Sequence, residues 1–123
     1  MEVLKREEEE LPIPNAWRQT FVDVLTAFKD GDFRLENKIA RVHALAEHDA
    51  ERISVNIKDY GDELISLSDE TWNTSIYRWM GDYWEVLIDL VTLNEGVSDL
   101  VMFVRVTEEA GNYSFKIEDV HVP

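Results

Sequence analysis

The chain has 123 residues, of which 45% are hydrophobic and 11% aromatic, so it is long enough for one domain with an apolar core. It carries 26 acidic against 12 basic residues, a net charge of -14, which argues against nucleic-acid binding and against docking on anionic lipid. The lack of cysteine excludes disulfides, thiol catalysis and cysteine-ligated zinc. The charged start has no signal-peptide pattern, and the apolar stretches are too short to span a bilayer. These features predict a soluble, cytoplasmic domain.

Residues 1–14 are expected to form a charged, proline-containing lead-in, followed by a single α+β domain over residues 15–123. The four consecutive glutamates at positions 7–10 are typical of a solvated segment. Pro12 and Pro14 then oppose a regular element across them.

The first helix is predicted from a stripe of large apolar side chains at helical spacing. Asn15 is a suitable N-cap, and Gly31 can take the left-handed conformation that closes a helix. The stripe needs a broad apolar surface to cover it, which favours packing on a sheet. Its members are Trp17, Phe21, Val24, Leu25 and Phe28.

The sequence predicts the secondary structure of residues 32–60 less clearly. The segment 39–46 fits a short helical stripe, but the pattern is weak. Residues 49–60 fit both a strand, through alternate apolar residues, and a helix, through apolar residues three and four apart. We predict a helix because Asp49 is a good N-cap and Gly61 a good C-terminal stop.

From Glu63 onward the pattern changes to short β-type runs separated by turn residues, with one helical turn near Trp72. The runs cover residues 64–67, 75–80, 83–93, 99–107 and 113–122. Their short connections predict antiparallel pairing between neighbours. The predicted fold class is therefore α+β, with N-terminal helices packed on a twisted antiparallel β-meander of about four to five strands.

The acidity and the aromatic residues both concentrate in the sheet half. Residues 59–123 hold 14 acidic residues and only three basic ones. One interpretation is that the aromatics form the core and the acids are ordinary surface. The other is an acidic, aromatic recognition face for a basic protein, in which aromatics supply contact area and acids steer the encounter. The candidate partner-binding residues of that face are Tyr77, Asp82, Tyr83, Glu85, Asp89, Glu95 and Asp99.

Catalytic and metal-binding chemistry finds little support. His43 and His48 are five residues apart, which places them on different faces of a helix rather than in a metal-binding pair. The acids around residues 89–99 do not match a calcium loop. Glu85 and Asp89 have no flanking feature that would support acid–base hydrolysis. We therefore predict no catalytic residues, no metal and no cofactor.

The segments 84–90 and 94–100, together with the ending His121-Val122-Pro123, are similar to a family of short uncharacterised bacterial α+β proteins. The likeness covers most of residues 11–123, including Trp72, Trp79 and the step at residues 60–61. It transfers no catalytic residues. In type, the chain also resembles immunity proteins of bacterial toxin systems, including contact-dependent growth inhibition, which are small, acidic and cysteine-free. That resemblance implies a role, the neutralisation of a toxin domain by binding it, and no residues.

A long helix followed by a bent meander also resembles the cystatin-like and nuclear-transport-factor-like folds. That resemblance implies a ligand pocket between helix and sheet, with Trp17, Phe21, Trp79 and His121 as candidate lining.

The leading hypothesis is a non-enzymatic immunity protein that covers the active site of a basic toxin domain. The alternative is a small ligand-binding or enzymatic domain with a pocket between the first helix and the sheet.

Overall fold

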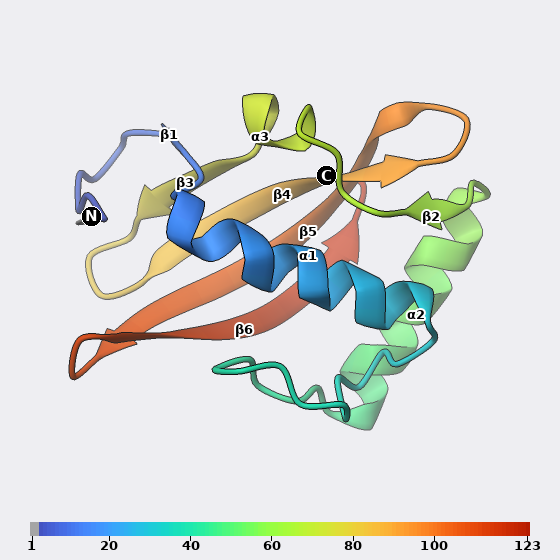
Figure 1. Ribbon diagram of the computed structural model, residues 1–123, viewed down its shortest axis with the longest axis horizontal. Coiled ribbons are helices and arrows are strands. Elements are labelled where there is room, and N and C mark those ends of the chain that lie inside the picture. Colours follow the sequence, from blue (N-terminus) through green and yellow to red (C-terminus); the bar gives the residue numbers. More distant parts are fainter. Residues whose placement is uncertain (1–2) are drawn as a thin grey trace.

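The chain folds as an α+β protein in which α1 lies across one face of an antiparallel sheet and α2 packs beside β6 (Figure 1). The computed structural model describes residues 3–123. No helix of those residues has the length and apolar character needed to cross a bilayer. The helices are α1 (Asn15–Lys29), α2 (Glu47–Tyr60) and α3 (Thr71–Thr74). The strands are β1 (Leu11–Pro12), β2 (Leu64–Ile65), β3 (Ile76–Trp79), β4 (Trp84–Thr92), β5 (Gly96–Glu109) and β6 (Asn112–His121).

The sheet has six strands, and its central part is the expected meander. Strands β3 to β6 follow one another in space in chain order, each antiparallel to the next. The short strand β1 pairs with β3, while β2 pairs with the end of β4, where Leu64 lies opposite Thr92. The pairing of β2 brings the segment after α2 against the β4–β5 hairpin.

The core fills the space between α1 and the inner face of the sheet. The predicted stripe of α1 is buried throughout, with Phe21, Val24 and Leu25 fully inaccessible. Strand β4 alternates as expected, because Trp84 and its even-numbered neighbours face the core while the odd-numbered residues from Glu85 to Asp89 face outward. Large aromatic side chains dominate this interior, with Trp17 in edge-to-face contact with Tyr77, Trp84, Tyr113 and Phe115.

Two details of the helix termini differ from the prediction. Asn15 is the first helical residue rather than the N-cap, which is Pro14, a residue whose fixed φ suits the entry to a helix. Helix α2 starts at Glu47, so Asp49 lies in its first turn, where its negative charge still favours the helix dipole. Gly31 and Gly61 do take the predicted left-handed conformation, with φ of 86° and 83°.

The weak helical stripe expected at residues 39–46 is not a helix. This segment runs in irregular conformation along the edge of β6, where the backbone N–H of His43 donates to Phe115 and that of Phe115 donates to Arg41. These bonds satisfy backbone groups of an edge strand that would otherwise be unpaired. The pairing therefore replaces the intrahelical hydrogen bonds that the prediction assumed.

The lead-in packs on the sheet although its glutamates are exposed. Val3 is buried, and the Nε1 of Trp84 donates to the carbonyl of Leu4 at 3.0 Å. The Lys5 ammonium lies 5.1 Å from the ring centre of Trp79, a cation–π contact. The two prolines do not prevent the two-residue strand β1, because the short pairing at the sheet edge needs few donors.

Candidate protein-binding surface

The seven predicted partner-binding residues do not form one surface. Tyr77 is 4% exposed and faces the core, because it pairs with the inward-facing Val86. Its hydroxyl accepts a hydrogen bond from the backbone N–H of Leu4 at 3.2 Å. The prediction of Tyr77 as a binding anchor is therefore wrong: this side chain is not available to a partner.

Tyr83 and Glu85 lie on the outer face of the sheet beside two arginines. Arg78 donates to Glu85 at 2.8 Å, and the guanidinium carbon of Arg105 lies 3.9 Å from the ring centre of Tyr83. The hydrogen bond to Glu85 raises the pKa of Arg78, so the guanidinium stays charged. The negative charge of Glu85 is thus offset by Arg78, and the ring of Tyr83 is covered by Arg105.

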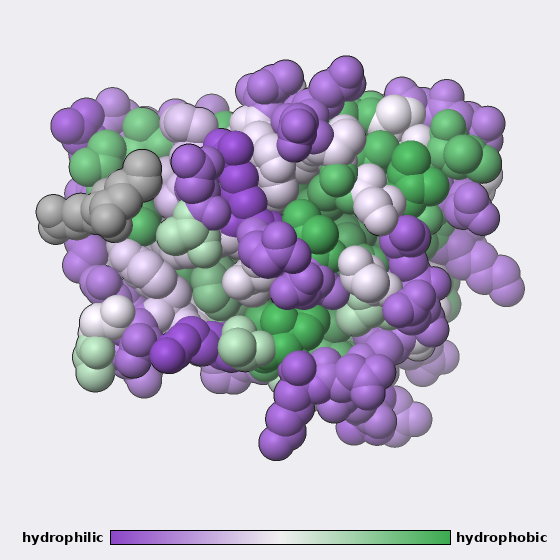
Figure 2. All heavy atoms as spheres, in the orientation of Figure 1, coloured by the Kyte–Doolittle hydropathy of each residue, from purple (hydrophilic) through white to green (hydrophobic). Residues whose placement is uncertain are grey.

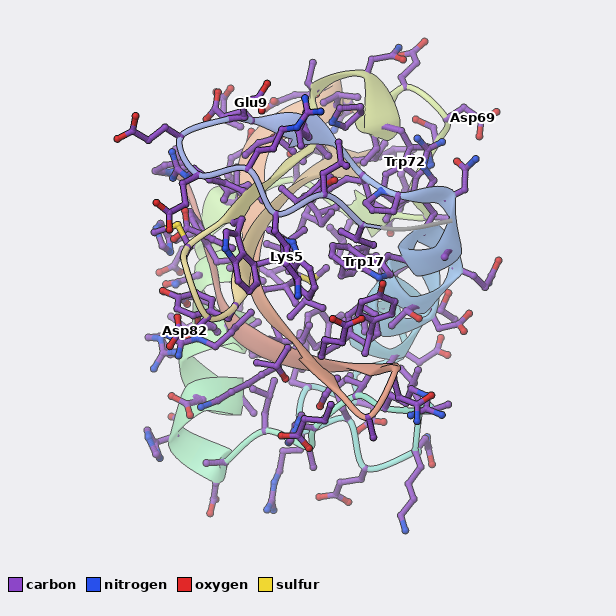
Figure 3. All side chains as sticks on the ribbon, turned by 90° about the vertical axis from the view of Figure 1, so that its left-hand side faces the viewer. Lys5, Glu9, Trp17, Asp69, Trp72 and Asp82 are labelled. Atoms are coloured by element: carbon purple, nitrogen blue, oxygen red, sulfur yellow. The ribbon has the colours of Figure 1, made fainter. Side chains whose placement is uncertain are left out.

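Asp82 lies at the β3–β4 turn and is exposed. Figure 3 shows it well separated from Asp69 and Trp72. An acidic face around Tyr83, Glu85 and Asp82 is therefore weaker than predicted, because basic side chains of neighbouring strands offset its charge.

The other three predicted residues, Asp89, Glu95 and Asp99, gather at the opposite end of β4. Thr74 donates its hydroxyl to Asp89, and the backbone N–H of Asp89 donates to Ser75 at 2.9 Å. Glu95 and Asp99 are exposed and flank the β4–β5 turn. Asp89 and Asp99 line the same open groove, while Glu95 lies in the turn between β4 and β5.

Three further acids join them, Asp59 from the last turn of α2 and Asp62 and Glu63 from the segment that follows it. The carboxylate of Asp62 accepts hydrogen bonds from the backbone and side-chain amides of Asn94 at 3.2 and 2.7 Å. The hydroxyl of Thr92 and then the amides of Asn94 lower the pKa of Asp62, which keeps it ionised at neutral pH. We call the combined set the acidic hairpin surface. It consists of Asp59, Asp62, Glu63, Asp89, Glu95 and Asp99.

Tyr60 joins the two parts of this surface. Its hydroxyl donates to Glu95 at 2.8 Å and accepts from the backbone N–H of Asp99 at 3.2 Å. Burial, and then the carboxylate of Glu95, raise the pKa of Tyr60, so the phenol keeps its proton. The C-terminal end of α2 therefore fixes the geometry of the hairpin.

The surface is grooved and partly apolar. Two open grooves of about 620 and 340 Å³ share Val122 as a wall, with Asp89 and Asp99 lining the first and Asp59 the second. Val122 is 51% exposed and Leu93, at the tip of the hairpin, is 60% exposed. In Figure 2, apolar residues reach the surface over the β4–β5 hairpin and β2, among hydrophilic ones.

None of the six carboxylates takes part in an ion pair within residues 3–123. The same part of the chain contains no cluster of three or more side chains arranged to hold a metal ion. The negative charge of this end is therefore uncompensated by the fold, in contrast to Glu85.

Sequence reasoning did not find Asp59, Asp62 and Glu63, because their position depends on the pairing of β2 with β4. The local signal was the dense run of acids on either side of Gly61. A domain of unknown function, DUF7668, matches residues 25–123. The chain belongs to the DUF7668 family. No curated protein and no solved structure matches it. The DUF7668 match includes the whole acidic hairpin surface but begins within α1, after Trp17 and Phe21.

Proposed function

We propose that the chain is a non-enzymatic binding protein that neutralises a basic protein, in the manner of a bacterial immunity protein acting on a toxin domain in the cytoplasm. The acidic hairpin surface would cover the cationic active site of that toxin and exclude its substrate. The observation that carries the proposal is the set of six carboxylates that form no ion pair within residues 3–123 and lie beside two partly apolar grooves.

The negative charge of the acidic hairpin surface affects first the rate at which the chain and a basic partner associate. Complementary charge can raise association rates to about 10⁸–10⁹ M⁻¹s⁻¹ at low salt, against about 10⁵–10⁶ for neutral surfaces. Rapid capture is what an inhibitor of an intracellular toxin requires. The net charge of -14 adds to the same long-range attraction.

The grooves and exposed apolar residues supply the short-range part of the interaction. Leu93 and Val122 offer apolar area beside the acids. A lysine or arginine of the partner can pack its methylenes on Val122 while its charged end reaches Asp99 or Asp89. Acids that attract the partner and apolar side chains that hold it once bound together fit a protein partner better than a small cation.

The test is capture of the partner with a pair of charge-reversed variants. Asp59→Lys with Asp99→Lys reverses two acids whose side chains make no hydrogen bond or ion pair within residues 3–123, so the fold should be retained. The control, Glu51→Lys with Glu109→Lys, makes the same change in net charge at exposed positions outside the acidic hairpin surface. Tagged proteins are incubated with native lysate and washed in about 0.5 M salt, where the Debye length is only a few ångströms.

We expect wild type and control to retain one stoichiometric basic protein, and the Asp59/Asp99 variant to lose it. Expression of that captured protein alone should arrest growth, and co-expression of the wild-type chain should restore it. Equal retention by both variants would show that the acidic hairpin surface is not the binding surface. A captured protein without toxicity would refute the immunity role.

A further inference from the structure

A second candidate site lies on a different part of the molecule, between α1 and the β5–β6 hairpin. An open cleft of about 310 Å³ is formed there by the first turns of α1, residues 40–41, and the β5–β6 turn with the start of β6. Its size is at the lower end of ligand sites in proteins. The acidic hairpin surface shares no residue with it.

The charge of this cleft is opposite to that of the rest of the molecule. The chain has 26 acidic residues, yet none of them lines the cleft, whereas Arg41 does. Arg41 is exposed and takes part in no ion pair within residues 3–123. An unpaired guanidinium with no neighbouring carboxylate is suited to an anion, which it can bind through two parallel hydrogen bonds.

The wall of the cleft is aromatic. Trp17, Tyr113 and Phe115 all line it. Trp17 is 1% exposed, and its indole N–H has no acceptor within residues 3–123. Figure 3 shows Trp17 between α1 and the sheet.

The backbone holds Arg41 at the cleft in an unusual conformation. Its φ of 66° lies in the left-handed region, which long side chains rarely adopt. Its carbonyl accepts the backbone N–H of Phe115 at 2.8 Å, which ties the residue to β6. The backbone of Arg41, from which the side chain starts, is therefore fixed beside β6 by the fold.

We propose that this cleft binds a small planar aromatic carboxylate. The carboxylate pairs with Arg41, and the ring packs against the aromatic wall, of which Trp17 is a part. The aromatic wall favours a planar ring over an aliphatic chain, and the lack of acids favours an anion over a neutral or basic molecule.

The experiment titrates the whole protein with 4-hydroxybenzoate and follows the four indole N–H resonances by NMR. We expect the Trp17 resonance to shift in a saturable way at millimolar ligand, and that of Trp72, which lies on α3, to stay unchanged. Two related probes separate the contributions. Acetate has the charge without the ring, and 4-hydroxybenzamide has the ring without the charge, so each should bind at least tenfold more weakly.

The variant Arg41→Gln should weaken binding of 4-hydroxybenzoate at least tenfold, and Arg41→Lys should restore part of the loss. The hydrogen bond from the backbone N–H of Phe115 to the carbonyl of residue 41 remains in both variants, so the fold should be retained. Arg34→Gln, in the same segment but outside the cleft, serves as control and should leave the affinity unchanged. The proposal is overturned if the Trp17 resonance does not move, if the benzamide binds equally well, or if Arg41→Gln binds like the wild type.

Discussion

The Tyr77 hydroxyl ties the N-terminal segment to the sheet, and Tyr77→Phe removes that contact while keeping the ring. The ring remains in edge-to-face contact with Trp17 at 5.5 Å, so no cavity forms. The change is the loss of one partly buried hydrogen bond, of 3.2 Å, from the backbone N–H of Leu4. Such a bond contributes about 0.5–1.5 kcal/mol to stability. For a chain of this size we expect the melting temperature to fall by roughly 3–5 °C per kcal/mol.

Urea unfolding measures the loss of stability, and hydrogen exchange measures its location. Exchange at the Leu4 amide should accelerate in the variant, although the carbonyl of Leu4 still accepts from Trp84. Tyr83→Phe is the matched control. Its ring is covered by Arg105 and its hydroxyl makes no hydrogen bond within residues 3–123, so stability should change by less than about 0.5 kcal/mol. Unaltered Leu4 exchange in Tyr77→Phe, or equal effects of the two variants, would refute the assignment of Tyr77 to the core.

Three other substitutions test separate parts of the account. The pKa of Asp49 is lowered in the folded protein, chiefly by its hydrogen bond from Arg52. The contribution of the Asp49 carboxylate to stability is therefore complete at pH values above the pKa of an unfolded aspartate, about 3.9, and is lost as the pH falls through the lower pKa of the folded state. The difference in urea midpoint between wild type and Asp49→Asn should therefore shrink between pH 5 and pH 3, and a pH-independent difference would contradict this. Phe21→Ala should cost about 3–5 kcal/mol in urea unfolding because Phe21 is fully buried; a loss below 1 kcal/mol would contradict its place in the core. Gly96→Ala should cost about 1–2 kcal/mol, since φ is 75° and no heavy atom lies within 4 Å of the added methyl group; an unchanged unfolding midpoint would argue against that turn conformation.

The parts of the fold that the sequence predicts are those set by local periodicity. The stripe of α1 is long and regular, so the buried face follows from it directly. In β4, strict alternation separates Trp84 and Val86, which are buried, from Glu85 on the outer face. Gly61 ends α2 where expected because few other residues tolerate the left-handed conformation there.

The failures come from contacts between distant segments. In β3, apolar residues occur on both faces, Tyr77 and Trp79 on one and Ile76 on the other, so the sequence does not show which way Tyr77 points. The register with Val86 decides it. The contact of Asp62 with Asn94 spans about 30 residues and depends on the pairing of β2 with β4. A run of acids identifies charge, but only the structure shows that Glu85 pairs with Arg78 whereas these acids form no ion pair within residues 3–123.

The most direct test of the proposed function is the association rate of the chain with its captured basic partner as a function of ionic strength. Stopped-flow fluorescence can follow the four tryptophans at 0.05 to 0.5 M salt. We predict that the wild-type rate falls at least tenfold over this range, and that Asp59→Lys with Asp99→Lys lowers the rate at 0.05 M and flattens the salt dependence. A wild-type rate independent of salt, or a variant with the same rate and slope as the wild type, would contradict binding through the acidic hairpin surface.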